Sequence, residues 1–177
     1  MKLSKKYLIW TIIFSVIAIA INAYIIVHSC LDAVQSTEVS SGVIEVTEEV
    51  INTVAPGTIT PENHDSFVTI VRKAFGHFGL FMVSGFFYSL ALYLSISPFN
   101  KQKYYQIIII ALAFGLLMGL VTETIQLFVE GRSGEFTDVL IDFSGYLLGF
   151  LIILLILFLI IRHIRKEEKK QLELSHK

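Results

Sequence analysis

Four long apolar runs limit what this chain can fold into. They cover residues 7–27, 67–96, 104–129 and 137–161, and each reaches the roughly twenty residues that a helix needs to cross about 30 Å of hydrocarbon. Hydrophobic residues make up 54% of the 177 and charged residues only 16%, which is too apolar for a soluble domain and too short for several domains. The sequence therefore predicts one all-α membrane domain, residues 1–177, with four transmembrane helices.

The charges between the runs predict which side of the membrane each segment faces. Basic residues precede the first run and fill the tail 162–177, whereas residues 28–71 carry seven acids and no Lys or Arg. Because basic segments stay in the cytoplasm, both termini are expected there and the loop 28–66 outside. The charges form no basic patch, so no nucleic-acid partner is expected.

A short amphipathic helix is expected inside the outer loop. Valines recur at helical spacing between Val43 and Val54, after Ser40, which can cap the helix. The pattern should end near Pro56. A solvated acidic loop is the alternative for the first ten residues of this segment.

Two other interpretations of the N-terminal region stay open. A basic start and the small Ala18 and Ala20 are typical of a signal peptide, although the first run exceeds the usual apolar core of about 7 to 15 residues. Val27–Cys30 also resembles a lipoprotein box, with the bulky His28 where a small residue is wanted. Cys30 is the single cysteine, so no internal disulfide forms and its modification is undecided.

Polar residues gather where the third run ends and the fourth begins. Glu123 and Gln126 end one helix, Arg132 lies in the turn, and Asp138 and Asp142 open the next helix. A turn this short normally joins antiparallel neighbours, so these groups should face one another at the outer side of the membrane. Ionisable groups cost roughly 3 kcal/mol each when they face lipid, which makes them the first candidates for a functional site.

The outer end of the second run lies at the same predicted depth and carries Arg72, Lys73 and His77. The two cations either reach out to lipid phosphates or hold an anionic ligand group, and both interpretations stay open. Small residues point to close helix packing deeper in the membrane, at Gly115 and Gly119 in the third run and at Gly145 and Gly149 in the fourth.

The chemistry that this group supports is acid–base or anion-binding chemistry. Glu123 and His77 are the candidate catalytic acid and base, and the candidate ligand-binding residues are Arg72, Lys73, Gln126, Arg132, Asp138 and Asp142. The cofactor is unknown; a divalent cation such as Mg²⁺ would be held by Glu123, Asp138 and Asp142. The sequence contains no zinc-protease, nucleophile-elbow or phosphate-loop motif.

Each of these residues also has a purely structural interpretation. Asp138 can cap the fourth helix, and Gln126 can form a hydrogen bond between helices. Glu123 and Arg132 can form a structural ion pair, and His77 can be a hydrogen-bonded residue of the bundle. The group is more persuasive than its members, because so small a bundle has little structural need for so many polar groups at one depth.

Three segments resemble the VanZ-like membrane proteins. They are Gln35–Val43 (QSTEVSSGV), Arg72-Lys73 followed by Gly76-His77-Phe78, and above all Glu123–Gly149. The last is similar to the family pattern of Glu and Gln ending one helix, Arg-Ser-Gly in the turn, and Asp-x-x-x-Asp with two glycines in the next helix. The resemblance covers most of residues 30–150.

The resemblance implies a multi-pass protein of the bacterial plasma membrane, and it links some members to resistance to teicoplanin and related lipoglycopeptides. Together with the polar group, it leads us to expect binding or modification of an anionic, lipid-linked envelope component, a precursor or a lipid headgroup, in the outer leaflet. One alternative is a non-enzymatic scaffold or binding subunit that acts through the acidic outer loop. A proton-coupled permease is disfavoured because the acids cluster at one surface. The oligomeric state and any turnover are left open.

Overall fold

The computed structural model describes residues 5–96 and 101–175, and these residues form helices joined by turns and loops, without strands. The helices, in chain order, are α1 (Lys5–Ser29), α2 (Ala33–Val54), α3 (His64–Val71), the π-helical segment η1 (Arg72–Gly79), α4 (Leu80–Ser95), α5 (Lys101–Gln126) and α6 (Phe136–Ser175). Within the described residues four helical stretches are long and apolar enough to cross a membrane: Tyr7–Ser29, His64–Ser95, Tyr105–Gln126 and Phe136–Leu174. The expected all-α architecture with four membrane helices is therefore confirmed at this level.

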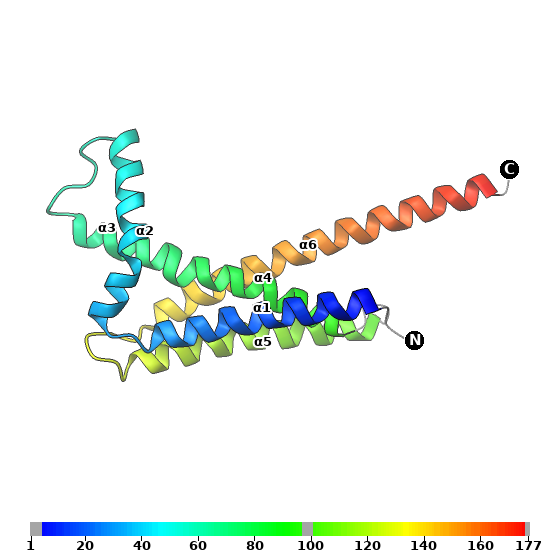
Figure 1. The fold of residues 1–177 in the computed structure, drawn as a ribbon, viewed down its shortest axis with the longest axis horizontal. Helices are drawn as coiled ribbons and strands as arrows, with labels where there is room; N and C mark the ends of the chain where they lie inside the picture. Colours follow the sequence, from blue (N-terminus) through cyan, green and yellow to red (C-terminus); the bar gives the residue numbers. More distant parts are fainter. Residues whose placement is uncertain (1–4, 97–100, 176–177) are drawn as a thin grey trace.

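The membrane helices form a bundle in which α6 packs against η1, α4 and α5, while α1 packs against α4 and α5. Figure 1 shows α1 and α5 running side by side, with the continuous stretch α3–η1–α4 crossing α6. Ile25, Phe81, Met118 and Tyr146 form the buried apolar cluster. Many other large apolar side chains are exposed on α1, α5 and α6, as expected for surfaces that face lipid.

Glycines let the helices approach one another at three of the four predicted positions. A Cβ atom on Gly115 would overlap the ring of Tyr146, and one on Gly145 or Gly149 would overlap the carbonyl group of Phe78 or Met82 in the facing helix. Gly119 is less tightly packed, since its Cβ would lie 3.4 Å from the Cβ of Asp142. The spacing between η1–α4 and α6 thus depends on the absence of side chains at Gly145 and Gly149.

Helix α2, in the segment predicted to lie outside the membrane, begins earlier than the valine pattern suggested. It starts at Ala33, where Asp32 accepts a hydrogen bond from the backbone of Gln35 and the Gln35 side chain accepts one from the backbone of Asp32, a capping box that satisfies two free helix donors. It ends at Val54, because the residue before Pro56 is pushed out of the helical region. Figure 1 shows α2 lying across one end of the bundle.

Helix α6 continues well beyond the expected end near Ile161. Residues 162–175 contain no Gly or Pro and are rich in Arg, Lys, Glu, Gln and Leu, which favour helix. The basic segment expected as a tail is therefore helical as far as Ser175, and residues 162–174 are all exposed. Figure 1 shows this part of α6 extending past the other helices.

Candidate functional site

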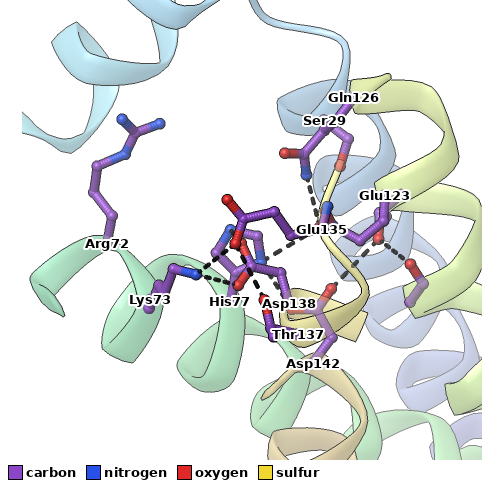
Figure 2. Close-up of polar contacts among 12 residues, drawn as sticks. Ser29, Arg72, Lys73, His77, Glu123, Gln126, Glu135, Thr137, Asp138 and Asp142 are labelled. Atoms are coloured by element: carbon purple, nitrogen blue, oxygen red, sulfur yellow. Dashed lines mark hydrogen bonds and ion pairs between the residues drawn. The ribbon is translucent and has the colours of Figure 1, made fainter. Parts of the chain in front are cut away.

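The predicted polar residues meet at one end of the bundle, where η1, the end of α5 and the start of α6 come together (Figure 2). Gly131, in a left-handed conformation with a φ of 71°, turns the chain between α5 and α6. The segment η1 carries Arg72, Lys73 and His77, and wide helical turns of this kind are common at functional sites. Its sequence gave no sign of the wide turn.

His77 lies at the centre of three carboxylates. Its Nδ1 atom is 3.0 Å from Oδ1 of Asp142 and 3.6 Å from Oε1 of Glu123, and its Nε2 atom is 3.8 Å from Oδ2 of Asp138. Asp142 is fully buried, and Glu123 and Asp138 are 4% and 6% exposed. A neutral imidazole can donate from only one nitrogen, whereas an imidazolium can donate to carboxylates on both sides, so the arrangement suits a residue that gains and loses a proton.

Lys73 neutralises part of this acidic group. Its Nζ atom donates a short hydrogen bond to Asp138 and another, 3.2 Å long, to Oε2 of Glu135. Asp138 therefore forms an ion pair with Lys73, in addition to lying in the first turn of α6. Glu135, just outside that helix, has its pKa lowered because the ammonium group of Lys73 and the hydroxyl of Thr137 donate hydrogen bonds to the carboxylate.

The two partners of Lys73 predict a contrast in stability. Replacing Glu135 with glutamine is expected to cost at most about 1 kcal/mol, because the carboxylate is exposed and solvent screens the pair. Replacing Lys73 with glutamine should cost several kcal/mol, about 3 or more, because it leaves the buried Asp138 without its cation. Thermal unfolding of the two purified variants in detergent measures the difference; equal losses would show that the Lys73–Asp138 pair contributes little.

Glu123 is held in place by two hydrogen bonds. Its Oε2 atom accepts from the backbone N–H of Glu135 at 3.0 Å, and its Oε1 atom accepts from Nε2 of Gln126 at 3.0 Å. The other end of Gln126 accepts from Arg132, at 2.7 Å from Nη2 and 3.3 Å from Nε. In the described part of the chain Glu123 and Arg132 form no direct ion pair, because Gln126 lies between them.

Arg132 and Arg72 converge on a residue that the sequence pattern did not single out as part of the site. Nη1 of Arg132 and Nη2 of Arg72 donate to the hydroxyl oxygen of Ser36, at 2.6 Å and 2.9 Å. Ser36 comes from α2 and is fully buried. Burial and the nearby charge of Arg72 both lower the pKa of Arg132. Figure 2 shows Arg72 pointing away from the carboxylates that Lys73 approaches.

A metal ion would find one compact donor set within the described residues. His77, Glu123 and Asp142 each offer a ligand atom, and these atoms lie within 4.8 Å of one another. His77 thus takes the place expected for Asp138, which pairs with Lys73 instead. An imidazole with two carboxylates suits Zn²⁺ or Mn²⁺ better than the all-oxygen Mg²⁺ site that the sequence suggested.

Three residues of the network were missed from the sequence as site residues: Ser36, Glu135 and Thr122. Thr122 lies 3.5 Å from Oδ2 of Asp142, close to the limit for a hydrogen bond. Ser36 belongs to the segment Gln35–Val43 noted for its resemblance, which was the only available signal. Glu135 directly precedes α6, and an acid at a helix start usually acts only on the helix dipole.

The cavities of the described residues differ in what lines them. One of about 510 Å³ lies along α1, α4 and α5 near Ala18 and Phe114, and one of about 300 Å³ lies near Phe150 and Leu157. Both are mainly apolar, as crevices for lipid chains would be. A cavity of about 160 Å³ beneath α2 is lined by His28, Arg72 and His77, and a pocket of about 20 Å³ reaches into the network itself.

Four membrane-spanning helices around a buried network of charged side chains define a multi-pass membrane protein with an ionisable site at one end of its bundle. The VanZ/LLP1 family model matches residues 12–159, which include most of each of the four spans and every residue of the network. The chain belongs to this family. No curated protein and no solved structure matches it.

Proposed function

We propose that this protein binds or modifies an anionic, lipid-linked component of the bacterial cell envelope, at the outer leaflet of the plasma membrane, with both termini in the cytoplasm. One observation carries the proposal: His77 lies among the buried carboxylates of Glu123, Asp138 and Asp142, with two arginines at the edge of this network. Charged groups buried in a membrane protein are costly and commonly mark the place where it acts.

In this proposal each group has a defined role. His77 and Glu123 exchange a proton with the ligand, and Asp142 orients the imidazole through Nδ1. Arg132 holds the anionic group, while Lys73 forms an ion pair with Asp138. If a divalent cation is bound by His77, Glu123 and Asp142, it would supply a Lewis acid for the same anionic group.

The family membership supports a role in glycopeptide resistance, which extends the same proposal. A protein that alters a lipid-linked component of the outer leaflet can change the response to a lipoglycopeptide such as teicoplanin. We expect deletion of the gene to increase susceptibility to teicoplanin.

The second candidate function is a non-enzymatic scaffold that recruits envelope machinery through the acidic loop. The exposed valines of α2, among them Val46, Val50 and Val54, favour it, because they form an apolar surface outside the bundle.

Deleting residues 42–54 distinguishes the two candidates. The deletion removes the outer part of α2 but leaves Ser36 and its hydrogen bonds with the arginines. If the buried network acts on a ligand, the variant should keep measurable teicoplanin resistance at normal membrane abundance. A scaffold acting through α2 would lose resistance completely, which would contradict the leading proposal.

A further inference from the structure

Two guanidinium groups at one buried hydroxyl are an unusual arrangement. Arg72 and Arg132 both donate to Ser36, and neither forms an ion pair with a carboxylate among the described residues. Lys73, which follows Arg72 in the sequence, donates hydrogen bonds to Asp138 and Glu135 instead. Two like charges held at a neutral group repel each other, and an anion between them would remove this cost.

The cavity next to Arg72 is lined mainly by apolar side chains. The cavity of about 160 Å³ lies beneath α2 and has Arg72 and His28 at its polar end and Tyr24, Val43, Phe75 and Leu80 along its walls. The small pocket that contains Arg132 shares His28, His77 and Leu80 with it. The two spaces therefore adjoin one another, and Arg72 lines one while Arg132 lines the other.

We propose that this space binds an amphiphile with a phosphate group and one apolar chain, the phosphate between Arg72 and Arg132 and the chain in the cavity beneath α2. The inference rests on the proposed function and adds the chemical class of its ligand. Phosphate fits because two planar guanidinium groups and a hydroxyl offer it several donors in fork geometry. Burial and the charge of Arg72 lower the pKa of Arg132, and the carboxylates of Glu123 and Asp138 oppose this shift only in part.

Dodecyl phosphate tests the proposal with the full-length protein in neutral maltoside detergent. Native mass spectrometry should detect one dodecyl phosphate bound per chain, whereas inorganic phosphate and dodecanol, each lacking half of the ligand, should bind far more weakly. Arg72→Gln and Arg132→Gln should each weaken dodecyl phosphate binding about tenfold or more, as expected for loss of a charge-assisted hydrogen bond. The matched control is Arg162→Gln, an exposed cation on α6, which should bind as the wild type does.

A second variant tests the chain cavity without touching the charges. Val43 lines the cavity and is 43% exposed, so tryptophan can be introduced there without disturbing the bundle. Val43→Trp should lower the affinity for dodecyl phosphate to that for inorganic phosphate. Wild-type affinity for dodecyl phosphate in both arginine variants, or equal affinity for inorganic and dodecyl phosphate in the wild type, would overturn the proposal.

A further variant, Glu123→Gln, distinguishes a failure of the anion site from a failure of the proposed function. It is assayed for dodecyl phosphate binding and for teicoplanin resistance. If the arginine variants lose the ligand but Glu123→Gln keeps full resistance, the anion site stands and the proposed chemistry fails. If Glu123→Gln loses resistance while both arginine variants bind normally, the anion site fails, and with it the role given to Arg132, but the proposed role of Glu123 stands.

Discussion

Replacing Glu123 with glutamine is expected to abolish function while the protein still accumulates in the membrane. The amide has the size of the carboxylate, so the approach of α5 to η1 and α6 should persist. A carboxylate accepts from both Glu135 and Gln126, whereas an amide accepts at only one end, and this should cost about 1 to 3 kcal/mol of stability. Loss of the acid–base group itself should reduce turnover by about 100-fold to 10,000-fold.

The measurement for this variant is teicoplanin susceptibility together with membrane abundance. Thr124→Val is the matched control, since Thr124 lies one residue away on α5 but is exposed and bonds only to its own helix. The control should behave as the wild type. If Glu123→Gln keeps resistance, Glu123 has no role in function; if abundance falls in step with resistance, its role is structural.

Replacing Gly149 with valine is expected to destabilise the bundle strongly. Even a Cβ atom at this position would overlap the carbonyl of Met82 and lie 2.7 Å from the backbone nitrogen of Phe86, and neither backbone can move aside alone. Helix α6 would have to separate from α4, at a cost of about 3 kcal/mol or more. Because α4 continues from η1, the same movement would pull His77 away from Asp142.

Thermal unfolding in detergent measures this effect, and Gly42→Ala provides the control. A Cβ atom on Gly42 meets nothing within 4 Å, and alanine within a helix should raise stability by about 0.5 to 1 kcal/mol. The valine variant should unfold well below the wild type, or fail to accumulate, while the alanine variant unfolds slightly above it. Similar stability of Gly149→Val and wild type would show that the close approach of α6 to α4 is dispensable.

The number of membrane helices and most members of the site could be predicted from the sequence, for a simple physical reason. Hydropathy marks the spans, and polar residues within apolar runs are so costly that they stand out. The short turn around Arg132 then predicted that Glu123 and Asp142 lie on facing helices. In the structure both carboxylates approach the same atom, Nδ1 of His77.

The contacts that the sequence did not predict are those that depend on direction or on distant segments. Arg72 and Lys73 are neighbours in sequence, but adjacent residues of a helix point to different sides, so one joins Ser36 and the other joins Asp138. Ser36 lies in a polar, acidic segment where a serine carries no signal of burial. Hydropathy also could not predict where α6 ends. It identifies membrane spans, whereas the last part of α6, residues 162–175, is a polar helix beyond the apolar run.

The most direct test of the central claim is a comparison of lipid-linked envelope components by mass spectrometry in cells that lack the protein, carry the wild type or carry Glu123→Gln. If the network around His77 acts on such a component, one phosphate-bearing species should change in abundance or mass with the wild type, and cells with Glu123→Gln should match the cells without the protein. Identical lipid profiles in all three strains, with the protein present at normal abundance, would contradict the account.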